Sequence, residues 1–166
     1  MKELIKRIAS LAESHPEKVV LYPPANDTDI AYVEGNFSFK FHEDLRELYR
    51  FSNGLSFLDY CLLGIGNKRI ADFHQDNYHD ELIFDSKKVF TLIGTSGYHE
   101  FGFLIGQSES IILVDSVNQD LSLISNSFES FFNKLISRVE LILKSEHSKD
   151  ELMMYIDDES LPELSW

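Results

Sequence analysis

The sequence predicts a single α+β domain in which helices flank a mainly antiparallel sheet and a long C-terminal helix packs on that sheet. The chain has 166 residues, which fits one domain and is short for two. Helical periodicity occupies both ends, while β-branched and aromatic runs separated by short turns occupy the middle. Strands flanked by helices at both ends are typical of one antiparallel sheet covered by helices.

The first part of the chain predicts a helix and then a short strand. Apolar residues recur at helical spacing from Lys2 to about Ser14. His15-Pro16 ends this helix, because proline pushes the residue before it out of the α region. A strand is expected over residues 18–22, and Pro23-Pro24 prevents it from continuing.

Two shorter helices are predicted next. Asn26 or Asp27 can cap the first, with Asp29 well placed in its first turn. The second runs from about Glu43 to Phe51. Asn53-Gly54 is expected to stop it, because glycine takes the left-handed C′ position at no steric cost.

The sheet is predicted in the middle of the chain. One strand is expected over 58–65, where nearly every residue is apolar, and a long connection over 66–88. The later turns are short enough for hairpins, so an antiparallel meander is expected, with strands at 89–93, 101–105, 111–115 and 121–124. Gly94 begins one of the turns. The continuous apolar run at 111–114 indicates a strand covered on both faces.

A long helix from about Ser127 to Lys144 is the strongest periodic pattern, with apolar residues three and four apart over its whole length. Asn126 and Glu129 resemble a capping box at its start. A short apolar helix around Leu152, Met153 and Ile156 is expected in the segment that follows.

The acidic charge limits the class of partner. Acidic residues number 28 and basic residues 15, for a formal net charge of −13. Such a charge repels phosphates, so direct nucleic-acid binding is not expected, and anionic membrane surfaces are disfavoured. A basic protein partner would be attracted. An acidic surface also keeps a protein soluble, with no partner required.

Two segments concentrate the acids. Residues 146–166 hold seven acidic residues and one lysine, and residues 70–86 hold five acidic residues. These segments suit recognition of a basic partner, although they are also compatible with plain solvated edges. The candidate partner-binding residues are Asp72, Asp76, Asp80, Glu81, Asp157, Asp158 and Glu159.

The sequence contains no apolar stretch of a signal peptide or of a membrane-spanning helix, which predicts a cytoplasmic protein. It also predicts no enzyme. Cys61 lies among apolar residues, as a core cysteine does, and His74 and His79 match no established metal-ligand spacing. Metal-assisted hydrolysis through these two histidines is therefore a minor alternative. No nucleophile elbow, phosphate loop or dinucleotide fingerprint occurs, so no catalytic residue, metal or cofactor is predicted.

Several short motifs, taken in order, resemble the SUKH superfamily, which includes the fungal cell-wall-assembly regulator domain and many bacterial immunity proteins. The motifs are a proline-bearing entry, a short helix with a glutamate, a helix that ends in Asn-Gly, a later Ile-Gly, and a Ser-Phe-Glu-Ser-Phe start to the long helix. The matching signature positions are Pro24, Glu34, Asn53, Gly54 and Gly94. Asn36-Phe37-Ser38-Phe39 replaces a glycine-containing segment that is usual before the third helix, and this leaves the subfamily open.

The resemblance covers about residues 18–145, so it implies one SUKH-like domain over 1–166 with an acidic tail at 146–166. It implies an α+β fold without catalytic residues. For a stand-alone copy it implies immunity, meaning that the protein binds and neutralises a cognate toxin, often a nuclease with a basic effector domain. The alternative is a regulatory scaffold of the fungal type.

Overall fold

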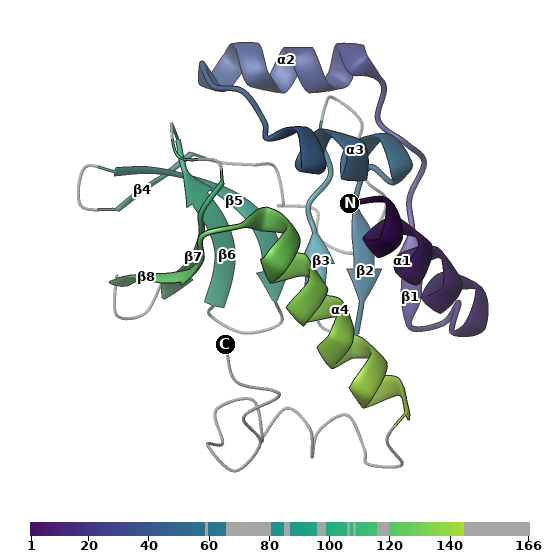
Figure 1. Cartoon of the computed structure of the whole chain (residues 1–166). Coiled ribbons are helices and arrows are strands. Elements are labelled where there is room, and N and C mark those ends of the chain that lie inside the picture. The colour runs from purple at the N-terminus through teal and green to yellow at the C-terminus, as the bar shows by residue number, and fades with distance from the viewer. Residues whose placement is uncertain are drawn as a thin grey trace.

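The computed structural model describes residues 1–58, 60–65, 81–84, 87–95, 99–105, 107, 109–115 and 120–144. Within these ranges the chain forms four helices and eight strands (Figure 1). The helices are α1 (Lys2–Ser14), α2 (Asp27–Phe37), α3 (Glu43–Phe51) and α4 (Phe128–Lys144). The strands are β1 (Val19–Leu21), β2 (Leu55–Phe57), β3 (Tyr60–Leu62), β4 (Glu81–Phe84), β5 (Lys87–Thr95), β6 (His99–Leu104), β7 (Ile111–Asp115) and β8 (Asp120–Ser125).

The strands form one antiparallel sheet in the order β1-β2-β3-β5-β6-β7-β8. The long strand β5 has two neighbours along the same edge. Its first half pairs with β4, where Phe84 is opposite Lys87 and Glu81 is opposite Phe90. Its last three residues pair with β3. The predicted α+β class and the meander of the later strands are confirmed.

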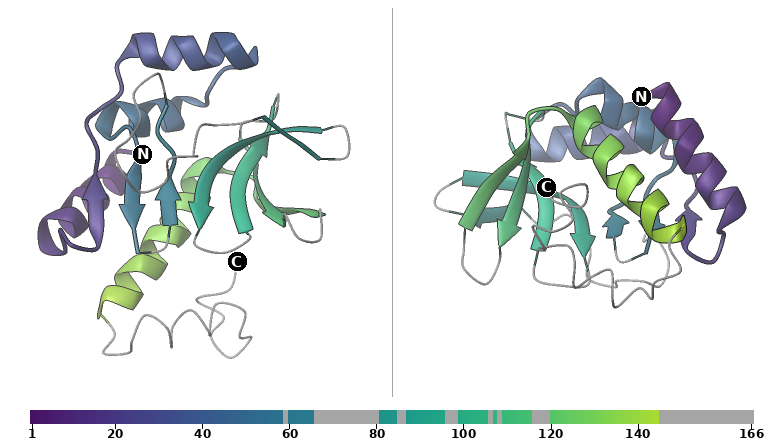
Figure 2. Two further views of the ribbon diagram at one scale, coloured as in Figure 1. Left: turned by 180° about the vertical axis from the view of Figure 1, so that it is seen from behind. Right: turned by 60° about the horizontal axis from the view of Figure 1, so that its bottom comes forward.

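Helices α1 and α4 lie side by side on one face of the sheet, and the view from behind shows the strands in front of both (Figures 1 and 2). Three hydrogen bonds from the Arg7 guanidinium join the two helices. They reach Glu140 Oε1 at 2.9 Å, Asn133 Oδ1 at 3.0 Å and Ser137 Oγ at 2.9 Å. Helix α3 contacts α4, and α2 packs on α3 at the outside.

The main core lies between the sheet and these helices. Four phenylalanine rings, Phe39, Phe41, Phe90 and Phe103, meet at its centre with ring centroids 5.0–6.4 Å apart. Edge-to-face arrangements prevail among them, the geometry that the quadrupole of an aromatic ring favours. Phe39 and Phe41 come from the segment between α2 and α3, so this segment is anchored to β5 and β6.

The strand β7 is covered on both faces, as its continuous apolar run predicted. Ile111 belongs to the main core, whereas Ile112 and Val114 form a second cluster with Val89 on the other face of the sheet. Val114 is fully buried. Period-two alternation therefore divides the strand between two apolar environments.

Helix α1 has the predicted bounds, and α2 begins as predicted. Asn26 is the N-cap of α2: its Oδ1 accepts from the Asp29 N–H at 2.9 Å, and the Asp29 carboxylate accepts from the Asn26 N–H at 3.3 Å. This reciprocal pair satisfies two amides that the first helical turn leaves free.

The prediction of one strand over 58–65 is wrong. The chain forms a hairpin here, in which β2 pairs with β3: Leu55 is opposite Leu62 and Phe57 is opposite Tyr60. Leu58 in the turn has φ 56°, a left-handed conformation that residues other than glycine adopt rarely. The turn therefore lacks the glycine or Asn-Gly signal that would have marked it.

The prediction that 66–88 is a connection is wrong in its last part, because residues 81–84 form β4 and β5 begins at Lys87. The apolar run Leu82-Ile83-Phe84 was the available signal. Gly94 also lies within β5, and not in a turn after it.

The start of α4 also differs from the prediction. Ser127, not Asn126, is the capping residue: its Oγ accepts from the Ser130 N–H at 3.3 Å. The predicted helix around Leu152, Met153 and Ile156 lies outside the described residues, as does the whole tail 146–166. No helix in the described ranges is long and apolar enough to cross a membrane.

Candidate partner interface

The acidic residues predicted to bind a partner are largely outside the described part of the chain. This holds for Asp72, Asp76, Asp80, Asp157, Asp158 and Glu159. Glu81 is the first residue of β4, where its backbone is opposite Phe90 of β5. The role of these acids stays a prediction.

The signature glutamate is a buried ion-pair centre. Glu34, on α2, is 2% exposed, and its two carboxylate oxygens accept four hydrogen bonds. Arg46 Nε and Nη2 each donate at 2.9 Å, Lys40 Nζ donates at 2.8 Å and the Phe41 N–H donates at 2.9 Å. The carboxylate thus connects α2, the segment after it and α3.

The charge of Glu34 is stabilised in place. Burial alone would raise the pKa of this carboxyl, but the bonds from Arg46, Lys40 and the Phe41 amide outweigh burial and lower its pKa from 4.5 to about 2. Because every donor is within the fold and the carboxylate is covered, Glu34 holds the architecture and is not offered to a partner.

The signature Asn53 closes the end of α3. Its Nδ2 donates to the Ile65 carbonyl at 2.9 Å and its Oδ1 accepts from the Ile65 N–H at 2.7 Å. The Asn53 N–H donates to the Pro23 carbonyl at 3.1 Å, and the Ala25 N–H donates to the Tyr49 carbonyl at 2.9 Å. The segment that carries Pro24 is therefore bonded to the last turn of α3, while Pro24 itself is exposed.

Gly54 has φ 108°, so a side chain there would be strained, but it is not the C′ residue that was predicted. The C-cap is Ser52 in an extended conformation, which places Gly54 two residues later. The Ser52 hydroxyl accepts from the Tyr22 N–H at 2.9 Å, and its single proton can go to either the Tyr22 or the Gly54 carbonyl. These bonds fasten the residue that ends α3 to Tyr22, which follows β1.

The two glycines of the β5–β6 pair differ in how closely the chain approaches them. A Cβ on Gly94 would meet only Leu63 Cδ2, at 3.9 Å, among the described residues. A Cβ on Gly102 would lie 2.3 Å from the Phe90 carbonyl oxygen, beside the register shift between Thr91 and Ile93. Gly102 is thus the glycine that this bulge requires, and the motifs did not single it out.

No group of three or more histidine, cysteine or acidic side chains that could hold a metal ion occurs in the described ranges. His74 and His79 lie outside them. The Cys61 thiol is half-buried beside Ser56 Oγ, at 3.7 Å, and burial raises its pKa. A raised pKa lowers the thiolate fraction, which is opposite to what a nucleophilic cysteine needs.

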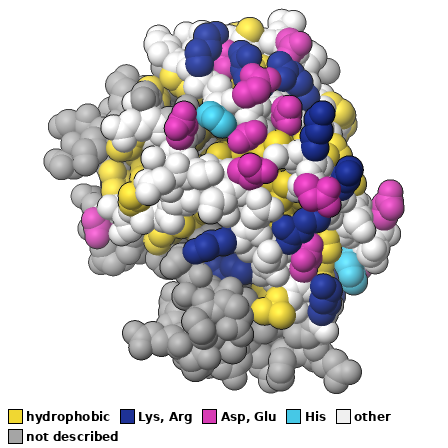
Figure 3. All heavy atoms as spheres, viewed as in Figure 1, with side chains coloured by type: hydrophobic (Ala, Val, Ile, Leu, Met, Phe, Trp, Pro, Cys, Tyr) yellow, Lys and Arg dark blue, Asp and Glu magenta, His cyan; other side chains and the backbone are white. Residues whose placement is uncertain are grey.

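The face over α1, α2 and α3 carries charges of both signs. Figure 3 shows Lys and Arg side chains interspersed with Asp and Glu. Arg50, for example, pairs with Asp27 and Glu43, both at 2.9 Å. These exposed pairs neutralise one another locally, so this face is not a uniformly acidic surface.

The edge strand β8 is the candidate interface. It ends the sheet order and, within the described residues, pairs only with β7. Ser122 and Leu123 are exposed, and Leu123 at 59% is the most exposed of the large hydrophobic residues identified in the described part of the chain. An edge strand presents unpaired N–H and C=O groups that a partner strand can bond.

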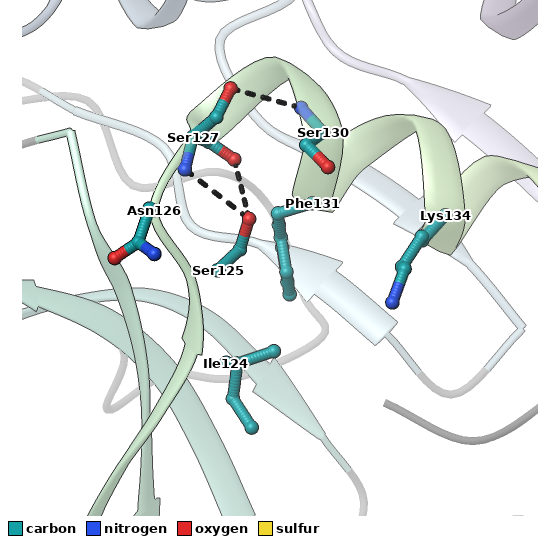
Figure 4. A pocket seen from close by; sticks show the side chains of 7 residues that line it. All are labelled: Ile124, Ser125, Asn126, Ser127, Ser130, Phe131 and Lys134. Atoms are coloured by element: carbon teal, nitrogen blue, oxygen red, sulfur yellow. Dashed lines mark hydrogen bonds between the residues drawn. The ribbon is translucent and has the colours of Figure 1, made fainter.

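Two hollows of about 340 Å³ each adjoin β8. The helix-side hollow lies between the end of β8 and α4 (Figure 4), and its lining is Ile124, Ser125, Asn126, Ser127, Ser130, Phe131 and Lys134. The outer hollow lies on the face away from α4, and its lining is Leu104, Gln107, Ser110, Ile112, Leu121, Leu123 and Asn126. Alternation along β8 therefore directs Leu121 and Leu123 to one hollow and Ile124 to the other.

Sequence reasoning identified neither Arg46 as the partner of Glu34 nor β8 as an edge. To find the first, one would have had to know that Glu34 is buried and that Arg46, on the next helix, faces it. The second had a signal in the sequence: residues 121–128 contain no charged residue.

Comparison with protein families identifies a match over most of the chain. The family model described as SMI1 / KNR4 family (SUKH-1) matches residues 24–134, about two thirds of the chain. The match begins at Pro24 and includes all of the signature positions and the whole of β8. No curated protein matches the chain.

Proposed function

The chain belongs to the SMI1/KNR4 (SUKH-1) family, and we propose that it is an immunity protein that neutralises a bacterial toxin by binding it directly inside the producing cell. The family match over residues 24–134 is the observation that carries this proposal. It is a non-enzymatic role, in which the fold provides a surface and the toxin provides the chemistry.

The charge of the chain supports a basic partner. A toxin that cleaves nucleic acid needs a basic groove for phosphates. A protein of net charge −13 is attracted to such a groove and can occupy it. Fast, salt-sensitive association and a buried area of roughly 1,600 Å² are the properties expected of the complex.

The test is co-expression of the chain with the toxin encoded beside its gene, followed by affinity purification. Restored growth and a co-purifying toxin are expected. A toxin of unchanged lethality, with no complex recovered, would refute the proposal. The negative control is Gly102→Ala, which disrupts the bulge between β5 and β6, destabilises the fold and should weaken protection.

A regulatory scaffold of the fungal type is the second candidate, because the family match that supports immunity is equally consistent with this role. It predicts stable cellular partners when no toxin is present. A pull-down from unstressed cells distinguishes the two: a scaffold brings down a constant set of proteins, whereas an immunity protein brings down only its toxin.

A further inference from the structure

We propose that β8 is a docking strand, beside which an extended segment of a protein partner adds to the sheet, with an apolar side chain at its centre and a Lys or Arg on each side of it. This inference rests on the proposed function for the identity of the partner. The edge, the outer hollow and the surrounding charge each support it independently.

The backbone of β8 is suited to pairing. The Leu121 N–H points away from β7 and donates to Asp120 Oδ1, at 2.8 Å, so a partner strand has to displace this carboxylate in order to bond it. By the two-residue period of a strand, the N–H of Leu123 points the same way. Natural edge strands are commonly protected by lysine, proline or a bulge. Residues 120–123 contain neither lysine nor proline, and the bulge comes only afterwards, between the pairs Ile112–Leu123 and Ile111–Ser125.

The outer hollow provides the apolar subsite. Leu104, Ile112 and Leu121 line it, and Leu123 stands exposed at its margin. An exposed leucine beside an apolar hollow loses water contact when a partner side chain fills the hollow, at roughly 25 cal/mol per Å² of apolar surface. A strand added at β8 directs every second side chain to the face of the sheet that carries this hollow, next to Leu121 and Leu123.

The charges beside β8 determine the flanking residues of the partner. Asp120 is exposed at the start of β8, and Glu109 is exposed two residues before Ile111, which pairs with the far end of β8. The neutral stretch 121–128 lies between them. Cationic side chains on both sides of an apolar residue complement this arrangement, whereas Lys134 belongs to the hollow on the opposite, helix side.

A second copy of the chain fits this surface less well. Two molecules of net charge −13 repel one another, and pairing of β8 with itself would bring the acids of both copies to one interface. A basic segment instead gains the attraction that the whole chain provides.

The test selects random 12-residue peptides displayed on phage against the purified full-length chain. Enriched peptides are expected to carry an apolar residue between Lys or Arg. Their affinity should fall at least about tenfold for Leu123→Lys, since a central apolar anchor dominates such interfaces. The matched control is Leu141→Lys, which makes the same change at an exposed leucine of α4 and should leave affinity unchanged.

Each outcome decides the proposal. Equal binding of the selected peptides to the two variants, or enrichment of acidic peptides, would overturn it. So would a dimer of the wild-type chain that Leu123→Lys dissolves, because β8 would then be occupied by a second copy. Equal melting temperatures of the two variants confirm that loss of binding is not loss of folding.

The same variants separate this proposal from the immunity role. If wild type and Leu123→Lys both rescue cells from the toxin, immunity stands and the docking strand is refuted. If the wild-type chain gives no rescue but its peptides require Leu123, the docking strand stands and the toxin role is refuted.

Discussion

Glu34 and Arg46 form a bidentate ion pair, with Nε and Nη2 of the arginine each 2.9 Å from a different carboxylate oxygen. The carboxylate is fully covered, whereas the arginine side chain is 27% exposed. The pair fastens α2 to α3, and Phe41 joins it through its backbone N–H. The glutamate that the sequence motif singled out is therefore a structural residue in this chain.

Replacing Glu34 by Gln should destabilise the fold by about 3 kcal/mol, because it leaves Arg46 without its buried counter-charge. Glu43→Gln is the matched control: Glu43 also pairs with Arg46, at 3.6 Å, but is 63% exposed and should cost less than about 1 kcal/mol. Urea denaturation measures both. Equal losses would contradict the assignment of Glu34 as the buried centre.

The stability contributed by Glu34 should depend on pH in a defined window. Its pKa is lowered in the fold from 4.5 to about 2, so its stabilisation is complete above the unfolded value and is lost as pH falls toward 2. The shift corresponds to roughly 3 kcal/mol. The difference in unfolding free energy between wild type and Glu34→Gln should therefore shrink between about pH 5 and pH 2. A constant difference across that range would show that the charge is not responsible.

Gly102→Ala should destabilise the fold by about 3 kcal/mol or more, because the added Cβ collides with the Phe90 carbonyl oxygen. Gly94→Ala should be neutral or stabilising by up to about 1 kcal/mol, since alanine restricts the unfolded chain and meets ordinary contact in the strand. Thermal melting of the two variants compares them directly. A larger drop in melting temperature for Gly94→Ala than for Gly102→Ala would contradict the assignment of Gly102 as the glycine that lies against the Phe90 carbonyl.

Asn53→Ala should cost about 3 kcal/mol, because both backbone groups of Ile65 lose their buried partner. Hydrogen exchange of the Ile65 amide should accelerate more than exchange in α4. Asn36→Ala, at an exposed position of α2, is the control and should stay within about 0.5 kcal/mol of wild type. Unchanged exchange at Ile65 would show that Asn53 does not close this end of α3.

The helices and the later strands were predictable because their apolar residues follow recognisable patterns. Apolar residues three and four apart identified α1, α3 and α4, and the turns between β5 and β8 carry glycine, serine or asparagine. The β2–β3 hairpin was not predictable in this way, because Leu58 takes a left-handed φ against its own preference. Tertiary pairing of β2 with both β1 and β3 overrides that local cost.

The interface was less predictable than the fold. The density of acidic residues predicted partner binding at residues 70–86 and 146–166. In the described part of the chain the candidate interface is β8, which the sequence marks only by a lack of charged residues. Whether a strand lies at the edge depends on the order of all the strands in the sheet. The local pattern of residues 120–125 therefore does not predict that β8 is an edge strand. The two signals are compatible, because acids can attract a basic partner that an apolar strand then binds.

The most direct test of binding without catalysis is a titration of the purified toxin effector domain with the purified chain, at toxin concentrations well above the dissociation constant. Toxin activity should fall in a straight line and reach zero at one chain per toxin molecule, because each chain occupies one active groove. Complete inactivation at a small fraction of that ratio would contradict the proposal and indicate turnover, and unchanged activity at an excess of the chain would refute neutralisation itself.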